Sequence, residues 1–417
     1  MKGNPNEVGR LSQNRRGRPW KCGVGSARLA LMAVTAGSVS PAPETFQSPQ
    51  TELLRRLRRV LVVVYGHLSD TMAATPALRS LRVALPAARI DVLVLRSARP
   101  VLSRSPHVDS LIEWSDFQHK GTSRGRLEKA ALVTTLGTRL RLHRYDATLV
   151  LHNGNRAMRL LAQAVGSPVR AGISDGGDSF THPVPSSPEA ESAQQENARV
   201  LAALGIEVDG GPVELRTSAD EREAAEALLG SGRGPLVGIH AGADWSCQQW
   251  LPERFAQVAS TLQREAGARI VLTGTGSEAA LEDLIARGMA EPPIRAAGRT
   301  TFGELVEVIR RLDLLVCVSS APSSIAAATG TPSVVLLGPE DGRYTGMIPE
   351  QRRRVLQPGG RRPGGSWCEL GRWGVLSGCE SPICRGIGGL DALGAAEVSA
   401  AALEMLVGQP ALRRGVS

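Results

Sequence analysis

The feature that most constrains this chain is a repeated alternation of short apolar runs with segments of helical periodicity. The run Val60 to Tyr65 is apolar throughout, stops at Gly66 and is followed by the helix-type segment Thr71 to Ala84. A continuous apolar run is typical of a parallel strand that helices bury on both faces. Three more such runs follow, at Ile90–Leu95, Ser110–Trp114 and Ala147–His152. This order of strands and helices predicts an α/β fold with a parallel sheet.

A second alternation of the same kind begins after residue 235. The stretch Gly230 to Pro235 contains three glycines and a proline, a composition typical of a hinge between domains. A chain of 417 residues is long enough for two cores. We therefore predict two doubly wound, Rossmann-like domains, residues 56–230 and 231–410, that face a cleft. Strand-type runs in the second are Leu236–His240, Arg269–Thr273, Ile294–Ala296, Leu314–Val318 and Ser333–Leu337.

Three stretches follow neither pattern. Residues 171–195 are rich in Gly, Ser, Pro and Asp, and residues 352–365 are basic and rich in Gly and Pro, compositions typical of irregular loops. Residues 1–55 form a basic N-terminal extension, which we predict to be disordered. A targeting signal around the apolar stretch Leu29 to Ala36 is the alternative interpretation.

Composition argues against two classes of protein. The formal net charge is +9, but residues 1–60 hold eleven Lys and Arg against three Asp and Glu, so the remainder is nearly neutral. Aromatic residues make up 3% of the chain, whereas nucleic-acid domains usually combine basic clusters with aromatics on one folded face. No run of about 18 apolar residues occurs, as a transmembrane helix would need. We expect no nucleic-acid partner and no membrane span.

The basic run over residues 55–59 leaves two interpretations open, contact with anionic lipid headgroups or a solvated helix face. The six cysteines are too few and too scattered for a disulfide framework. Cys368, Cys379 and Cys384 cluster, but structural zinc takes four ligands and no His follows His240. We predict a reduced, cytoplasmic protein without a metal site.

Chemistry is expected in the loops that follow the strands, because open parallel sheets bind ligands beyond their carboxyl ends. Asp70 lies where the first strand passes into a helix. Local sequence alone favours a helix N-cap at this position. The alternative is a general base that takes a proton from a hydroxyl, since a helix N-terminus stabilises the carboxylate.

Two loops in the second half are suited to a phosphate. The loop Thr273-Gly274-Thr275-Gly276 joins a strand to a helix, and its glycines let a phosphate or base approach the backbone. The acidic residue of a dinucleotide fingerprint is absent about 20 positions further on. The stretch Ser319 to Ser324 opens a helix with small hydroxyl residues and free amides, which suit a diphosphate. Helix capping would account for one or two of these serines.

Other catalytic patterns are missing or out of context. The sequence has no P-loop, no His-Glu-x-x-His pattern and no Asp-x-Asp pair for a divalent metal with a nucleotide sugar. The pattern Gly172-Ile-Ser174-Asp-Gly176 matches a nucleophile elbow, but no helical segment follows it. A hydrolase built on Ser174 is therefore not predicted.

Several motifs together resemble a known family. The segment from Val60 to Arg79 reads VLVVVYGHLSDTMAATPALR, and later motifs are GIHAG at 238–242, WLPERF at 250–255, VLTG at 271–274, AGRTT at 297–301 and AAATGTPSVVLLGP at 326–339. In order and spacing, over residues 57–340, they resemble the lipopolysaccharide heptosyltransferases of glycosyltransferase family nine. The resemblance implies a GT-B fold and an inverting, metal-independent transfer of a sugar from a nucleotide diphosphate donor, commonly ADP-heptose, to a hydroxyl of the lipid A core.

The resemblance also implies site residues. Asp70 falls on the family's proposed general base, which replaces the N-cap interpretation, and Gly66, Ser69 and Thr71 form the loop on the acceptor side. The positions implied for donor binding are Gly242, Gln248, Thr273, Gly274, Ser319, Ser320, Ala321 and Ser324.

Four positions depart from the family pattern. Ser69 replaces a Gly, so we expect its loop to be less free to adopt a positive φ. Gln248 replaces a Lys that would neutralise the diphosphate, and Ser319 and Ser324 replace an Asp and a His. Loss of the Lys is expected to cost about tenfold in donor affinity or rate, unless an Arg of the 352–354 cluster replaces it.

Two functions of different class follow. The first is a glycosyltransferase that moves a heptose-like sugar to a lipopolysaccharide core or related cell-surface glycan. It would need no metal or cofactor beyond an ADP-heptose-like co-substrate, and its acceptor would be a lipid-linked or core oligosaccharide. We expect it in the cytoplasm, with transient contact with the inner membrane. The second is a catalytically impaired relative that acts as a nucleotide-sugar-binding or scaffold protein.

Overall fold

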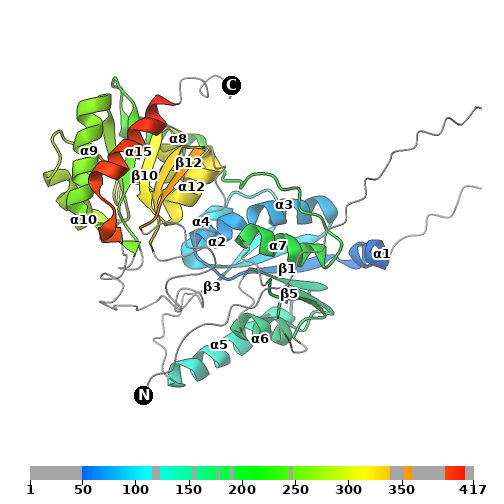
Figure 1. Cartoon of the computed structure of the whole chain (residues 1–417). Helices are drawn as coiled ribbons and strands as arrows, with labels where there is room; N and C mark the ends of the chain where they lie inside the picture. Colours follow the sequence, from blue (N-terminus) through cyan, green and yellow to red (C-terminus); the bar gives the residue numbers. More distant parts are fainter. Residues whose placement is uncertain are drawn as a thin grey trace, which may run out of the picture. The chain divides into compact units, whose positions relative to one another are not determined.

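The computed structural model describes residues 49–114, 123–152, 156–174, 176, 179–187, 192–243, 248–338, 352–358 and 390–408. Within these residues the chain forms two sheets of six strands, and every strand pair is parallel. Helices lie along the sheets, as Figure 1 shows. The predicted α/β fold with doubly wound parallel sheets is confirmed. Of the extension predicted to be disordered over residues 1–55, residues 1–48 lie outside the described part, as does the targeting signal, whereas residues 49–55 belong to a helix, Pro49–Arg56.

The first sheet has the strand order β3-β2-β1-β4-β5-β6. Alternate residues of β1 enter different cores. Val60, Val62 and Val64 pack with the apolar faces of α3 and α7, whereas Leu61 and Val63 pack with α5 and α6. Both faces of β1 are therefore buried, which explains its unbroken apolar sequence.

The strands of the first sheet are β1 (Arg59–Val64), β2 (Arg89–Leu95), β3 (Ser110–Trp114), β4 (Ala147–Leu151), β5 (Val169–Ile173) and β6 (His182–Val184). Its helices are α1 (Pro49–Arg56), α2 (Leu68–Ala73), α3 (Thr75–Ala84), α4 (Arg99–Leu102), α5 (Ser123–Arg141), α6 (Arg156–Val165) and α7 (Ala193–Ala202).

The second sheet has the order β12-β11-β10-β7-β8-β9 and is built in the same way. Leu314, Val316 and Val318 of β10 pack with α9 and α15, while Leu315 and Cys317 pack with α11 and α12. The strands are β7 (Leu236–His240), β8 (Arg269–Thr273), β9 (Ile294–Arg295), β10 (Leu314–Val318), β11 (Ser333–Leu336) and β12 (Arg353–Leu356). The helices are α8 (Ala219–Leu229), α9 (Pro252–Ala266), α10 (Ala279–Arg287), α11 (Phe302–Arg310), α12 (Ala321–Thr329) and α15 (Ala395–Val407).

The two sheets share the same strand connectivity, and this connectivity determines where ligands can bind. In each sheet the chain adds two strands on one side of the first strand and then returns to its other side. This reversal lies between β1 and β4 in the first sheet, and between β7 and β10 in the second. At such a point the loops after the two adjacent strands turn to opposite faces and leave a crevice at the carboxyl ends.

Two predicted loops are wrong in part. The stretch 171–195 contains the end of β5, all of β6 and the start of α7, and the stretch 352–365 contains β12. Both β6 and β12 are edge strands, paired on one side only. An edge strand is exposed along one side, so it does not need the apolar run that reveals a central strand. The sequence analysis missed both strands because their sequences lack an apolar run.

One segment that was predicted as a single helix forms two helices in the structure. The segment predicted over residues 71–84 is divided between α2 and α3, which meet at Ala74. Pro76 lies in the first turn of α3, where the missing N–H of proline costs nothing, so it starts a helix there instead of continuing one. The break sets α2 apart as a short separate helix directly after β1.

The boundary at residue 230 stays a prediction. Helix α8 precedes it in sequence, yet α8 packs against α11 of the second sheet. Among the described residues, no helix combines the length and the apolar character needed to cross a bilayer.

We predict that Tyr145→Phe destabilises the first sheet. The Tyr145 hydroxyl donates to Asp91 Oδ2 over 2.8 Å, and both residues are buried at 4% and 3% exposure. Burial and the neighbouring Asp91 raise the pKa of Tyr145, so the hydroxyl stays protonated and keeps donating. Loss of a hydrogen bond to a buried carboxyl should lower the free energy of unfolding by about 1.5–3 kcal/mol. Urea denaturation would measure it, and an unchanged midpoint would contradict the prediction.

Candidate active site

Asp70 lies at the carboxyl end of β1, next to the reversal point of the first sheet. It is the third residue of α2, and its Oδ2 accepts a hydrogen bond of 2.9 Å from the N–H of His67. Asp70 therefore satisfies an amide at the start of the helix from within the first turn, not as the N-cap residue. Its side chain remains 27% exposed.

Gly66 makes room for this carboxylate. A Cβ at position 66 would lie 2.3 Å from Asp70 Oδ2. That is far inside the contact distance of two heavy atoms, so any larger residue must displace the Asp70 side chain. Thr71 is buried and donates from its Oγ1 to the His67 carbonyl over 3.0 Å, which fixes the loop from the other side.

His152 is a site residue that the sequence analysis missed. It follows β4, the strand next to β1, and its Nε2 lies 3.4 Å from Asp70 Oδ1. Burial opposes the charged form of Asp70. The hydrogen bond and positive charge of His152, with the amide of His67, outweigh this effect and lower the pKa of Asp70. A histidine at the carboxyl end of a strand adjacent to β1 was the available signal, since such ends meet at one edge.

The serine cluster of the second sheet lies at the start of α12. Ser320 is the N-cap residue, but its hydroxyl donates to the Val318 carbonyl and accepts no bond from the first turn. The helix also has no acidic residue in that turn. Ser319 and Ala321 flank this cap, and Ser323 donates to the Ser320 carbonyl over 2.7 Å. Pro322 has no N–H, and the Ser323 amide donates to the Ser320 carbonyl over 3.0 Å. No capping side chain bonds the Ala321 amide, which suits this amide to an anion.

Two of the residues that depart from the family pattern meet each other. Ser324 Oγ of α12 donates to Ser69 Oγ of α2 over 3.1 Å. This contact brings the serine cluster within one side-chain length of the residue before Asp70. Ser69 is helical and is not among the residues with positive φ, so the expected restriction of its backbone has no consequence here.

The predicted residues at β7 and β8 form a second, tightly packed group. His240 Nδ1 lies 3.1 Å from Thr273 Oγ1, and burial lowers the pKa of His240. Gly242 and Gly274 border the Glu278 side chain, and a Cβ at Gly242 would lie 1.5 Å from Glu278 Oε1. The Glu278 carboxylate accepts from the Thr275 amide over 2.6 Å. Glu278, which the sequence analysis did not select, fills the space that Gly242 leaves.

Gln248 and the arginines of the 352–354 cluster are the positions considered in place of the family's Lys. Gln248 is buried, with 7% of its surface exposed. Arg352 donates to the Gly330 carbonyl over 2.6 Å, and Arg354 pairs with Glu404 at 2.9 Å. The Arg352 guanidinium is engaged at the end of α12 and the Arg354 guanidinium at α15, which weakens the idea that they replace the family's Lys.

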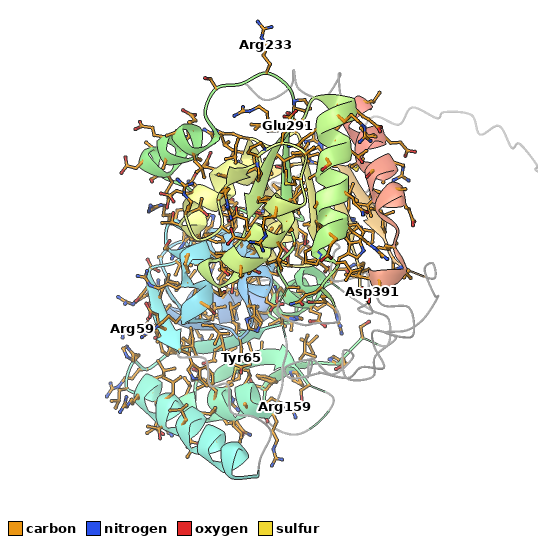
Figure 2. The ribbon with its side chains drawn as sticks, turned by 90° about the vertical axis from the view of Figure 1, so that its left-hand side faces the viewer. Arg59, Tyr65, Arg159, Arg233, Glu291 and Asp391 are labelled. Atoms are coloured by element: carbon orange, nitrogen blue, oxygen red, sulfur yellow. The ribbon has the colours of Figure 1, made fainter. Side chains whose placement is uncertain are left out.

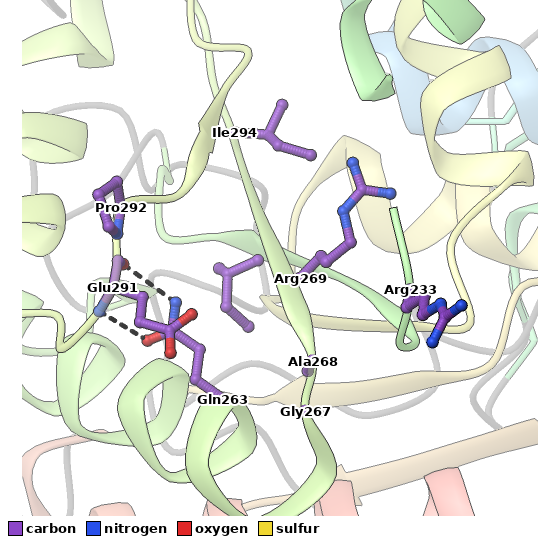
Figure 3. A pocket seen from close by; sticks show the side chains of 9 residues that line it. Arg233, Gln263, Gly267, Ala268, Arg269, Glu291, Pro292 and Ile294 are labelled. Carbon is purple, nitrogen blue, oxygen red and sulfur yellow. Dashed lines mark hydrogen bonds between the residues drawn. The ribbon is translucent and has the colours of Figure 1, made fainter. Parts of the chain in front are cut away.

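A cavity of about 240 Å3 lies elsewhere in the second sheet. Its wall includes Arg269, the first residue of β8, and Arg233, which precedes β7 (Figure 3). The cavity therefore lies at the amino ends of these strands. Gln263 and Glu291 close one side through two hydrogen bonds between the Gln263 amide and the Glu291 backbone. The Arg233 side chain extends outward from the ribbon (Figure 2). Ligands of such sheets bind at the carboxyl ends, so we do not assign this cavity to the reaction.

Some predictions fall outside the described residues. Cys368, Cys379 and Cys384 lie in the undescribed stretch 359–389. Within the part of the chain that the structure describes, no cluster of three or more His, Cys, Asp or Glu side chains is arranged to hold a metal ion. Ser174 follows β5 and donates to the Gly176 carbonyl over 2.8 Å.

Comparison with known proteins shows the family to which this chain belongs. Residues 133–363 match glycosyltransferase family 9 (heptosyltransferase). The chain is also 30% identical over 288 residues to lipopolysaccharide heptosyltransferase 3 of Escherichia coli (strain K12), covering 65% of this chain and 80% of the relative. The chain belongs to glycosyltransferase family 9. Lipopolysaccharide heptosyltransferase 2 of the same strain is 25% identical over 316 residues, with 71% and 87% coverage.

Solved structures of family 9 proteins share the fold. A family 9 glycosyltransferase of Veillonella parvula superimposes with a TM-score of 0.67 at 22% identity, covering 84% of this chain and 98% of that one. The Escherichia coli ADP-heptose lps heptosyltransferase II gives 0.62 at 21% identity, with 84% and 99% coverage. The predicted GT-B fold is confirmed, and this family 9 member is a glycosyltransferase enzyme. The roles of its individual site residues stay predictions.

We predict that Gly66→Ala impairs this family 9 glycosyltransferase without unfolding it. The new methyl group must move the Asp70 carboxylate, and a catalytic group misplaced by about 1 Å can cost about 100-fold in rate. Steady-state transfer assays would measure the loss. Gly394→Ala is the matched control, because a Cβ there meets no atom within 4 Å. Equal rates for the two variants would refute the steric argument.

Proposed function

We propose that this enzyme transfers a heptose-like sugar from a nucleotide diphosphate donor, of the ADP-heptose type, to a hydroxyl of a lipopolysaccharide core or related cell-surface glycan. The observation that carries the proposal is the contact between Ser324 and Ser69, which brings the start of α12 beside the residue before Asp70. Relatives named lipopolysaccharide heptosyltransferase support the same substrate class.

Asp70 is the general base of the proposed reaction. Its carboxylate takes the proton of the acceptor hydroxyl while the hydroxyl oxygen forms a bond to the anomeric carbon of the donor sugar. The bond between that carbon and the diphosphate oxygen breaks, and the nucleoside diphosphate leaves. A single displacement of this kind inverts the configuration at the anomeric carbon. The lowered pKa of Asp70 supports the role, because the carboxylate is ionised at neutral pH.

The donor diphosphate is held, in this proposal, by α12 and its serines. The Ala321 amide donates to the phosphate oxygens, and the Ser319, Ser320 and Ser324 hydroxyls supply further polar groups at the same helix start. The loop at Thr273 and Gly274 and the position Gly242 would contact the nucleoside part, and Gln248 would contact the diphosphate. We propose no metal requirement, so transfer should persist in EDTA.

The proposed place of action is the cytoplasmic face of the inner membrane, where a lipid-linked acceptor would be met. The exposed side chains of Arg55, Arg56 and Arg58 near α1 support contact with anionic headgroups, each contributing about 1 kcal/mol near such a surface. Arg56 also pairs with Glu52 at 2.9 Å, which reduces its share.

Isothermal calorimetry of the full chain against ADP, UDP, GDP and their sugar conjugates tests the donor site. Tight binding of one nucleotide sugar, followed by transfer to a core oligosaccharide, is the expected result. Binding without transfer would favour a catalytically impaired nucleotide-sugar-binding relative. A folded protein that binds none of them would refute the donor site as proposed.

We predict that Asp70→Asn lowers the rate of transfer by at least about 100-fold, the usual contribution of a general base, and leaves donor affinity nearly unchanged. Asn has the size of Asp but cannot take up the proton. Single-turnover assays and calorimetry would separate the two effects. Transfer at the wild-type rate would rule out Asp70 as the base.

We predict that Gln248→Lys tightens binding of the nucleotide diphosphate about tenfold. A charged hydrogen bond contributes about 1.5–3 kcal/mol against about 0.5–1.5 kcal/mol for a neutral one. The matched control is Gln249→Lys, since Gln249 is the exposed neighbour. Equal gains in both variants would show a general effect of charge and contradict a diphosphate contact at position 248.

A further inference from the structure

Asp70, His152 and Glu196 form a connected row of side chains from three different elements. His152 Nε2 faces Asp70 Oδ1 at 3.4 Å, and the other ring nitrogen, Nδ1, is hydrogen-bonded to Glu196 Oε2. Asp70 comes from α2, His152 from the end of β4 and Glu196 from α7. The imidazole is 15% exposed and the Glu196 carboxylate 28%. An imidazole ring can donate from both nitrogens at once only when it is protonated.

The backbone holds these three groups in place. His152 has φ of 44°, a left-handed conformation that non-glycine residues adopt at a cost. Asn197, the residue after Glu196, donates from Nδ2 to the Ala73 carbonyl at the end of α2 over 3.2 Å. This bond fixes α7 against the helix that carries Asp70. The strained histidine is therefore enclosed by two helices that are tied to each other.

Two carboxylates dominate the charge around His152. Burial disfavours the imidazolium, but the hydrogen bonds and charges of Asp70 and Glu196 outweigh it and raise the pKa of His152 to about 10. His67, which precedes α2, lowers the pKa of Asp70 through its amide hydrogen bond and its charge. Among the described residues, the other charged side chains on the packed elements lie on α6, β5, α7 and β1. They are Arg156 and Arg159 on α6, Arg170 on β5, which donates to the Ser179 and Ser167 carbonyls, Arg199 on α7, which donates to the Pro185 carbonyl, and Arg59 on β1, which donates to the His143 carbonyl.

We infer that His152 is a positioning residue, held as an imidazolium by Glu196, that aims the Asp70 carboxylate and keeps it ionised. This inference rests on the proposed role of Asp70 as base. With Oδ2 bound to the His67 amide and Oδ1 facing the imidazolium, the carboxylate cannot rotate freely. When Asp70 takes the acceptor proton, its negative charge is lost, while the charge of the imidazolium remains paired with Glu196.

The first test needs no substrate. The protein has seven histidines, and His152→Asn assigns the His152 signal in the NMR spectrum of imidazole-labelled protein. Asn is the matched substitution because it tolerates a left-handed backbone and carries no charge. We expect His152 to titrate near pH 10 in the wild type. In Glu196→Gln its pKa should fall by about 1–3 units, and Glu207→Gln, at an exposed position after α7, should leave it unchanged.

The second test follows Asp70. Its carboxyl 13C signal should show a pKa higher by about 1–3 units in His152→Asn, because the neighbouring positive charge is gone while burial remains. In transfer assays the acid limb of kcat/KM should move to higher pH by the same amount. In Glu196→Gln the alkaline limb should instead move to lower pH, as the imidazolium is lost earlier. A residue that only supports the fold would lower activity at every pH without moving either limb.

The outcomes separate the inference from the proposed function. A His152 pKa near 6.5 in the wild type, or an Asp70 pKa that is unchanged in His152→Asn, would overturn the inference whatever the enzyme transfers. Absence of transfer from every nucleotide sugar by the wild type would overturn the proposed function, while the NMR titrations would still decide whether His152 holds Asp70 ionised.

Discussion

Burial of both faces of two parallel sheets is the constraint on which every contact of the site depends. Because β1 and β10 are covered by helices on each side, their residues alternate between two apolar cores and leave no exposed face for chemistry. Polar and charged groups can gather only at the strand ends. The reversal of connectivity then selects β1 with β4, and β7 with β10, as the ends where a crevice opens. Asp70, His152 and the α12 serines all lie there.

The departures from the family pattern change how charge is balanced at these ends. A Lys, an Asp and a His are replaced by Gln248, Ser319 and Ser324, so these three positions carry no charged side chain. Ser324 and Ser69, two of the residues that depart from the pattern, are hydrogen-bonded to each other. Charged side chains remain around Asp70 and at Glu278, which borders Gly242 and Gly274. The loss of charge at these three positions favours an enzyme whose donor is held mainly by hydrogen bonds and whose base is preorganised by its neighbours.

Central elements could be read from the sequence because burial leaves a pattern in it. The strands over Leu236–His240, Arg269–Thr273 and Leu314–Val318 were predicted with the bounds that the structure has. Asp70 could be found because it follows such a strand. Edge strand β6 could not, because exposure removes the pattern, and α7 begins within the misread stretch. Glu196 therefore carried no local signal, and its pairing with His152, 44 positions away, exists only in the folded chain.

A base with a lowered pKa is at first sight a poor proton acceptor, and the position of His152 explains why it suits this site. A half-buried carboxylate without a partner would have a raised pKa and be protonated for part of the time. The imidazolium prevents this, and Glu196 prevents the imidazolium from losing its own proton. Asp70, His152 and Glu196 carry a negative, a positive and a negative charge, so their net charge is one negative unit, as a lone carboxylate would have. It therefore keeps the electrostatic attraction for a developing oxocarbenium-like centre while fixing the direction from which the proton is removed.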